Sequence, residues 1–298
     1  MIILLSQHTF GEKMKGYYHV SSHGLERNDI FKCDADFVQG MNDVAICVLG
    51  YDVSILCFCL MSNHFHFLLF GNLEECRQFA NEYKRRCGIR MRRESGEVKG
   101  LKSLDIQIDF VDSKDYLENV IAYILRNPMS AGIRVMPYNY KWSTVRLYFN
   151  EPKPSVGEKL NDMSERKRAR LLKSWKPVPD NYCLGDEGFV LPSCYVDVYA
   201  VEQIFGNPAR LMFLLSKKIE TEVELRMGIA DQIAMTDQEI ATQMKMLIQK
   251  EFGVSSIEQL SAEQRISLCL LLKRNYRANV KQIARLTRLA VDVVERVV

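Results

Sequence analysis

Two histidines separated by one residue lie in an apolar run at residues 61–70, and this run constrains the fold more than any other segment. Its sequence, Met-Ser-Asn-His-Phe-His-Phe-Leu-Leu-Phe, favours an extended strand, in which residues i and i+2 point to the same side. His64 and His66 therefore project together, while Phe65 and Phe67 project to the other side. Two neutral imidazoles side by side can hold one divalent cation. The alternative is two unrelated strand histidines, one of them hydrogen-bonded in the core.

A second segment, residues 114–128, carries apolar residues at steps of three and four, which is the pattern of an amphipathic helix. Ser113 is the expected N-cap, and Pro128 is expected to end or kink the helix at Asn127. Tyr123 and Asn127 are four residues apart, so both project from one face of the last turn. This spacing points to a tyrosine nucleophile and an amide oxygen as third metal ligand. The alternative is that Tyr123 packs at the rim of the helix and Asn127 merely ends it.

The first 150 residues are predicted to alternate strands and helices. The order β-α-β-β-α-β-α indicates an α+β fold, in which an antiparallel sheet has helices packed on one face. Strands are expected at 17–22, 53–60, 64–70 and 104–111, and helices at 35–49, 73–93 and around Tyr123.

Prolines, a glycine and polar residues at 150–157 mark a domain boundary. The predicted units are a first domain at 1–150, a basic and irregular linker at 151–195, and an all-α domain at 196–298. Helices are expected at 164–175, 196–206, 208–226, 237–251 and 262–276.

Residues 280–298 resemble a helix-turn-helix, with Ala284 at the helix crossing and 291–298 as the second helix. Arg288 replaces the glycine that is usual at the turn. The alternative is a helical-bundle cap with a solvated basic face.

Positive charge is concentrated locally, since the net charge of the whole chain is only +3. Two clusters, within 84–102 and 273–288, are suited to contact DNA phosphates, although a solvated helix face would look similar. The candidate DNA-binding residues are Lys84, Arg85, Arg86, Arg90, Arg92, Arg93, Arg285 and Arg288.

Composition places the chain among ordinary globular proteins, with 47% hydrophobic and 26% charged residues. Nine cysteines without a Cys-x-x-Cys pair argue against a zinc ribbon and a disulfide framework. The apolar run at residues 1–5 is too short for a signal segment, and no run reaches the length that crosses a bilayer. We therefore expect a cytoplasmic protein with no membrane partner.

Several short segments of the first domain together resemble one family. The family is the single-tyrosine HUH (His-hydrophobic-His) transposases, and the branch that the chain resembles is the REP-associated tyrosine transposases. The segments occur in the order found in that family, and the resemblance covers about residues 15–150. The matching segments are Tyr18-His19-Val20, Ile30-Phe31, Met61-Ser62-Asn63-His64-Phe65-His66, Tyr123-Ile124-Leu125-Arg126-Asn127-Pro128, Ala131-Gly132-Ile133 and Tyr140-Lys141-Trp142-Ser143.

This resemblance implies a ferredoxin-like or RRM-like plait that cleaves and rejoins single-stranded, hairpin-bearing DNA through a 5′-phosphotyrosine intermediate. Tyr123 would be the nucleophile, and His64, His66 and Asn127 would hold a divalent metal, Mg²⁺ or Mn²⁺. The implied partner is single-stranded or hairpin DNA, and the sequence leaves a homodimer open.

Two other functions stay open. One is a domesticated DNA-binding regulator that does not cut, and the other is an unrelated metal-dependent hydrolase in which the histidine pair activates water. Tyr123 together with both histidines favours the transposase over the regulator. Near His64 there is no further Asp, Glu or His at metal-ligand spacing, which argues against the hydrolase.

Overall fold

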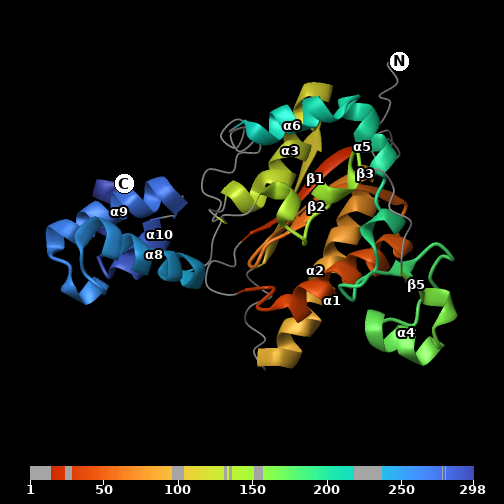
Figure 1. Cartoon of the computed structure of the whole chain (residues 1–298), viewed down its shortest axis with the longest axis horizontal. Coiled ribbons are helices and arrows are strands. Elements are labelled where there is room, and N and C mark those ends of the chain that lie inside the picture. The colour runs from red at the N-terminus through yellow and green to blue at the C-terminus, as the bar shows by residue number, and fades with distance from the viewer. Residues whose placement is uncertain are drawn as a thin grey trace, which may run out of the picture.

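The centre of the molecule is a four-stranded antiparallel sheet in the order β2-β3-β1-β4 (Figure 1). The computed structural model describes residues 15–23, 29–95, 104–130, 133, 136–150, 157–217, 237–276, 278 and 280–298. The strands are β1 (Gly16–His23), β2 (Val53–Leu60), β3 (Phe65–Gly71) and β4 (Asp105–Val111). The two central strands are β1 and β3, so side chains on them are shielded by neighbouring strands on both sides.

Helices cover both faces of this sheet, and the expectation of helices on one face is wrong. On β3, Phe65 and Phe67 pack against Tyr83 of α2 (Leu73–Ser95), with ring centroids 4.8 and 5.0 Å apart. The intervening His66 faces the opposite way, toward α3 (Lys114–Ser130). The helix α1 (Asp34–Cys47) packs beside α2. A layer of helices is needed on each face of the sheet, because β2 and β3 are buried on both faces along almost their whole length.

The helix α3 continues two residues past Pro128 instead of ending at Asn127. Pro128 has no N–H group, so the carbonyl oxygen of Ile124 loses its helical hydrogen bond while the rest of the ladder is retained. The amide of Ile133 then donates to the carbonyl oxygen of Pro128 at 3.0 Å, which satisfies one of the free carbonyl groups of the last turn. Tyr123 and Asn127 therefore lie in a complete helical turn.

Two further helices, α5 (Val198–Phe205) and α6 (Pro208–Ser216), pack on α3 (Figure 1). An ion pair of 2.8 Å joins Arg210 to the buried Glu118, and the guanidinium of Arg126 donates to the carbonyl oxygen of Leu215. The predicted helix at 208–226 ends at residue 216 in α6, and its last residues lie outside the described part of the chain.

Residues 157–197 form a small unit that packs on α1. It contains a two-stranded sheet, β5 (Glu158–Lys159) with β6 (Cys183–Leu184), and the helix α4 (Glu165–Leu172). Leu160 and Leu172 share a buried cluster with Ile46 of α1. The segment then reaches β2, where Asp197 donates its amide to the carbonyl oxygen of Ile55 at 2.8 Å. This contact covers part of an otherwise open sheet edge.

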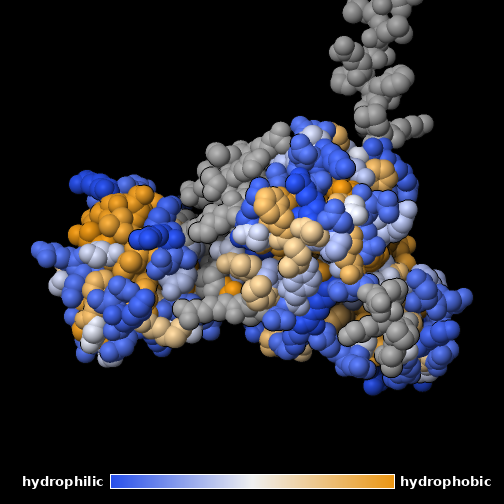
Figure 2. Space-filling model, turned by 45° about the horizontal axis from the view of Figure 1, so that its top comes forward, coloured by the Kyte–Doolittle hydropathy of each residue, from blue (hydrophilic) through white to orange (hydrophobic). Residues whose placement is uncertain are grey.

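The C-terminal residues form a separate group of helices (Figure 1). They are α8 (Asp237–Phe252), α9 (Ala262–Tyr276), α10 (Val280–Thr287) and α11 (Val291–Val297). Figure 2 shows a hydrophobic area on this group, and the exposed apolar side chains there are Met246, Ile266, Leu270 and Val291. Among the described helices, none combines the length and the apolar character that crossing a membrane requires.

Candidate metal and nucleophile site

His64, His66 and Asn127 meet where the start of β3 faces α3. The Nε2 atom of His64 lies 2.8 Å from Oδ1 of Asn127, and the Nε2 atom of His66 lies 3.0 Å from Nδ2 of the same side chain. All three side chains are nearly or fully buried. Two imidazole nitrogens and one carboxamide thus converge on a single point.

This donor set fits a divalent cation. Burial, together with the neighbouring His64, His19 and His23, holds the pKa of His66 well below its usual value. His66 is therefore neutral, which is the form that binds metal. Both ring nitrogens of His64 face amide oxygens, Oδ1 of Asn63 at 2.7 Å and Oδ1 of Asn127. A neutral ring can donate to only one of them, whereas a cation beside Nε2 would face lone pairs from both ring and amide.

No third acidic, thiol or imidazole ligand completes the site within the described residues, where no group of three or more His, Cys, Asp or Glu could hold a metal ion. The third protein donor in this arrangement is the amide oxygen of Asn127. Oxygen donors beside two imidazoles are compatible with Mn²⁺ and Mg²⁺, which accept water in the remaining positions.

Tyr123 lies one helical turn before Asn127, and its ring packs against His66. Its ring centroid is 5.5 Å from that of His66 in an edge-on arrangement, and its side chain is almost fully buried. The helical spacing predicted this proximity to Asn127. The contact with His66 depends on α3 lying over the face of β3 to which His66 points.

A third histidine, His19 of β1, belongs to the same cluster, and sequence reasoning assigned it no role. It is fully buried, its Nε2 atom lies 3.1 Å from Nδ1 of His66, and its ring meets Tyr123 edge-on at 6.0 Å. Burial lowers the pKa of His19 to about 3, so the ring is neutral. The only signal in the sequence was a histidine inside a predicted strand, among the segments that carry the family resemblance.

The cations of α2 lie on the other face of the sheet from Tyr123. Lys84 is half-buried, Arg85 and Arg92 are exposed, and the side chain of Arg93 lies outside the described residues. Arg86 and Arg90 are largely withdrawn from solvent, since their side chains are 11% and 10% exposed. A DNA strand at Tyr123 would therefore not meet this helix directly.

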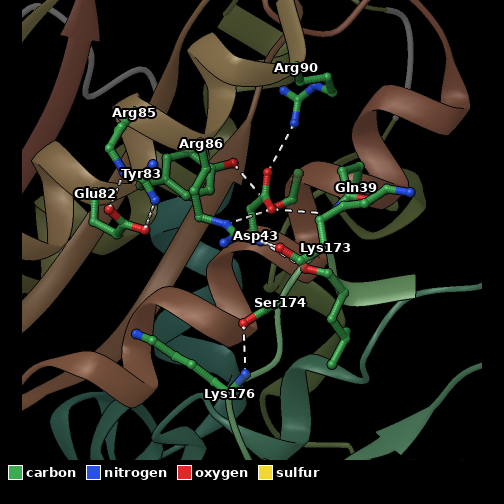
Figure 3. Close-up of polar contacts among 12 residues, drawn as sticks. Gln39, Asp43, Glu82, Tyr83, Arg85, Arg86, Arg90, Lys173, Ser174 and Lys176 are labelled. Carbon is green, nitrogen blue, oxygen red and sulfur yellow. Dashed lines mark hydrogen bonds and ion pairs between the residues drawn. The ribbon is translucent and has the colours of Figure 1, made fainter. Parts of the chain in front are cut away.

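Arg86 and Arg90 instead hold elements of the fold together (Figure 3). The carboxylate of Asp43, on α1, accepts from Arg86 Nε at 2.8 Å and from Arg90 Nη1 at 3.1 Å. Arg86 also donates to the carbonyl oxygen of Leu172 at the end of α4. Two of the expected phosphate contacts are thus engaged in joining α1, α2 and α4.

The two C-terminal candidates are also in ion pairs. Arg285 donates two hydrogen bonds to Asp237, at 2.7 and 3.0 Å, while the exposed Arg288 pairs with Glu258 at 2.8 Å. Arg288 has φ 58°, so the turn between α10 and α11 requires the left-handed conformation for which glycine is favoured. The left-handed residue between α10 and α11 is therefore at the position where the sequence analysis noted the missing glycine.

No family model and no curated protein matches the chain. A solved REP-associated tyrosine transposase bound to a REP hairpin is similar over 45% of this chain and 79% of its own, with 14% identity and a TM-score of 0.34. A likeness of this size carries no weight for function, which therefore rests on the residues of this chain.

Proposed function

We propose that the chain is a metal-dependent, single-tyrosine transposase or nicking enzyme of the HUH kind, with a ferredoxin-like plait, that cleaves and rejoins single-stranded or hairpin-bearing DNA. One observation carries this proposal. The carboxamide of Asn127 contacts Nε2 of both His64 and His66, while Tyr123, one turn away on the same helix, lies against His66. The order of the sequence motifs supports the same reading.

Tyr123 is the nucleophile in this proposal. Its phenolic oxygen forms a bond to phosphorus and gives up its proton to solvent, while the bond from phosphorus to the 3′ oxygen breaks. The leaving oxygen takes up a proton and becomes a free 3′-hydroxyl. The phosphotyrosine retains the energy of the broken ester, so that attack by another 3′-hydroxyl reverses the step without ATP.

The divalent cation held by His64, His66 and Asn127 would neutralise charge on the phosphate and stabilise the leaving oxygen. His19 orients this site. Nδ1 of His66 lies 3.1 Å from Nε2 of His19, and a proton on His66 Nδ1 would be donated to His19. The lone pair of His66 Nε2 would thereby be kept toward the metal position.

DNA is the proposed partner. The sequence motifs suggest single-stranded or hairpin DNA, and the C-terminal helix-turn-helix would contact duplex flanks through cations such as Arg288. A homodimer stays a prediction, as does a cytoplasmic location. A DNA-binding regulator that does not cut is the alternative, and it shares the partner but not the reaction.

The deciding experiment incubates the protein with a labelled hairpin-bearing oligonucleotide and Mn²⁺, followed by a denaturing gel. We expect a covalent adduct with wild-type protein and none with Tyr123→Phe, because phenylalanine keeps the packing and removes only the hydroxyl. The matched control is Tyr116→Phe, a second buried tyrosine of α3, which should keep the adduct. An undiminished adduct in Tyr123→Phe would remove Tyr123 from its role, and no adduct with any protein would favour the regulator.

The metal ligands are tested separately. His64→Ala, His66→Ala and Asn127→Ala should each lose the adduct while largely retaining DNA binding, because the ligands serve the chemistry and not the phosphate contacts. Binding is measured by fluorescence anisotropy with the same oligonucleotide. Wild-type cleavage by either histidine variant would show that this cluster is not the metal site.

A further inference from the structure

A third strongly basic segment is residues 164–176, which span α4 and the residues directly after it. They hold six Lys or Arg and one Glu, a net charge of +5, whereas the whole chain has a net charge of +3. The proposed reaction uses none of these residues. Figure 2 shows a mainly hydrophilic surface on the small body that carries α4.

The geometry of α4 turns these charges outward. Ala169 and Leu172 are buried toward the protein, whereas Arg166 and Arg170 are exposed. The helix stops at Lys173, which has φ 50° and is left-handed. Its end is fixed, because Arg86 of α2 donates to the carbonyl oxygen of Leu172 at 2.8 Å (Figure 3).

Trp175 follows this turn and is 68% exposed. Among the described residues, no aromatic ring and no cation is stacked on it. The other tryptophan, Trp142, is buried and has Lys141 over its ring at 4.4 Å. A large aromatic surface left in water is unusual for a side chain that gains much from burial, so it suits a partner that stacks.

The cations around Trp175 extend onto α2. Arg85 of α2 is hydrogen-bonded to Glu82, and this bond lowers the pKa of the Glu82 carboxyl. Nζ of Lys176 lies beside Gly50, shortly after the end of α1, where a Cβ added at Gly50 would come within 2.9 Å of it. A cleft of about 520 Å³ lies next to this surface, with Arg85 and Lys173 among its lining residues. Asp36 and Asp43 also line this cleft. We call the exposed side chains of α4, of the turn after it and of Arg85 the Trp175 surface, which comprises Arg85, Arg166, Arg170, Lys173, Trp175 and Lys176.

We propose that the Trp175 surface binds single-stranded DNA, as a second contact on the opposite side of the sheet from Tyr123. Proteins that hold unpaired strands combine cations along the phosphates with aromatic rings on which bases stack, and this surface offers both. A membrane surface is less suitable as the partner. Helices that lie on membranes present a broad apolar face, whereas the apolar residues of α4 face the protein.

The test measures binding by full-length Tyr123→Phe protein, which cannot cut its ligand by the proposed route. The probe is a fluorescein-labelled dT oligonucleotide of about 12 nucleotides. Trp175→Ala should weaken binding at least about fivefold, the lower end of the effect of removing one stacking partner. The matched control is Tyr199→Ala, which removes an aromatic side chain 70% exposed on α5 and should not change the affinity.

Charge and stacking are then separated. Replacing Arg170 and Lys176 with Gln should reduce the salt slope of binding by about 1.4, since each phosphate contact on a single strand contributes about 0.7. The charge-conserving pair Arg170→Lys with Lys176→Arg should keep the slope. Bound DNA should also quench tryptophan fluorescence in the parent protein and not in Trp175→Phe.

Equal affinities of the Trp175→Ala and Tyr199→Ala proteins would overturn the proposal. A fluorescence change with phosphatidylserine vesicles but not with DNA would also overturn it and would favour a membrane surface. Because binding is read without cleavage, the outcome does not depend on whether Tyr123 is the nucleophile.

Discussion

The Nε2 atom of His19 lies 3.1 Å from the Nδ1 atom of His66, and the two imidazole rings stack with centroids 5.2 Å apart across the central strands. His19 therefore contacts the back of a proposed metal ligand and the edge of the proposed nucleophile, Tyr123. It acts through these two residues and is a positioning residue in the proposed reaction.

Replacing His19 with Leu should weaken Mn²⁺ binding about 10- to 100-fold, the usual effect of losing a residue that orients a metal ligand. His19→Gln should restore part of the affinity, because its carboxamide oxygen can accept the His66 proton. The measurement is Mn²⁺ titration by electron paramagnetic resonance without DNA, with ¹⁵N NMR reporting the His66 tautomer. Ser21→Ala is the control, since Ser21 pairs with His66 in the sheet but its buried hydroxyl has no partner among the described residues. Unchanged Mn²⁺ affinity in His19→Leu would leave His19 a packing residue only.

A chain that ends at Lys217 should fold, whereas a chain that ends at Asn150 should not. The shorter chain loses the apolar residues of α5 and α6 that bury α3, namely Val201, Phe205, Leu211, Leu214 and Leu215. At about 1.5–3 kcal/mol for each buried side chain, their loss is comparable with the stability of a whole domain. Circular dichroism and urea unfolding measure this, and the chain ending at Lys217 should still form the adduct. A cooperative transition in the shorter chain would contradict the prediction.

Asp43→Asn should destabilise the protein by about 3–5 kcal/mol, because it leaves the buried charges of Arg86 and Arg90 without their carboxylate. Asp34→Asn, on the same helix, should cost about 1 kcal/mol or less, since Asp34 is 75% exposed in its pair with Lys141. Urea unfolding of the three proteins gives both differences. Similar losses of unfolding free energy in the two variants would mean that the ion pairs of Asp43 with Arg86 and Arg90 are not important for stability.

Arg288→Gly should be more stable than Arg288→Ala by about 1 kcal/mol. Both variants lose the ion pair with Glu258, so the difference isolates the left-handed backbone at φ 58°. Thermal unfolding measures it. If Arg288 also contacts a duplex phosphate, both variants should lower the salt slope of hairpin binding by about 0.9. An unaltered slope would make the α9–α11 region a structural bundle.

Stability should fall as the pH rises from about 8.5, the ordinary thiol value, toward 11. Burial raises the pKa of Cys87 to about 11, so in this window the unfolded chain has lost a proton that the folded chain retains. Each such thiol then lowers the free energy of unfolding by about 1.4 kcal/mol per pH unit. Cys87→Ala should show a shallower decline than wild type in urea unfolding at pH 8.5–10.5. The exposed Cys33 provides the control, because Cys33→Ala should keep the wild-type slope.

The sequence by itself determined the features that depend on local periodicity. The period of two placed His64 and His66 on one side of a strand, and the helical period placed Tyr123 and Asn127 on one face of a helix. Four strands and the main helices of the first domain follow from the same patterns and agree with the structure to within a few residues. These features could be predicted because they depend only on residues that are neighbours along the chain.

Only the tertiary structure decided which distant residues meet. The pairing of β1 with β3 brings His19 to His66, 47 positions away, and register between strands cannot be read from either strand alone. The covering of the second sheet face by α3 places Asn127 against both histidines, and Asp43 withdraws Arg86 and Arg90 from the surface. Charge along a helix shows which residues could bind phosphate, but burial and a nearby carboxylate decide which of them are available.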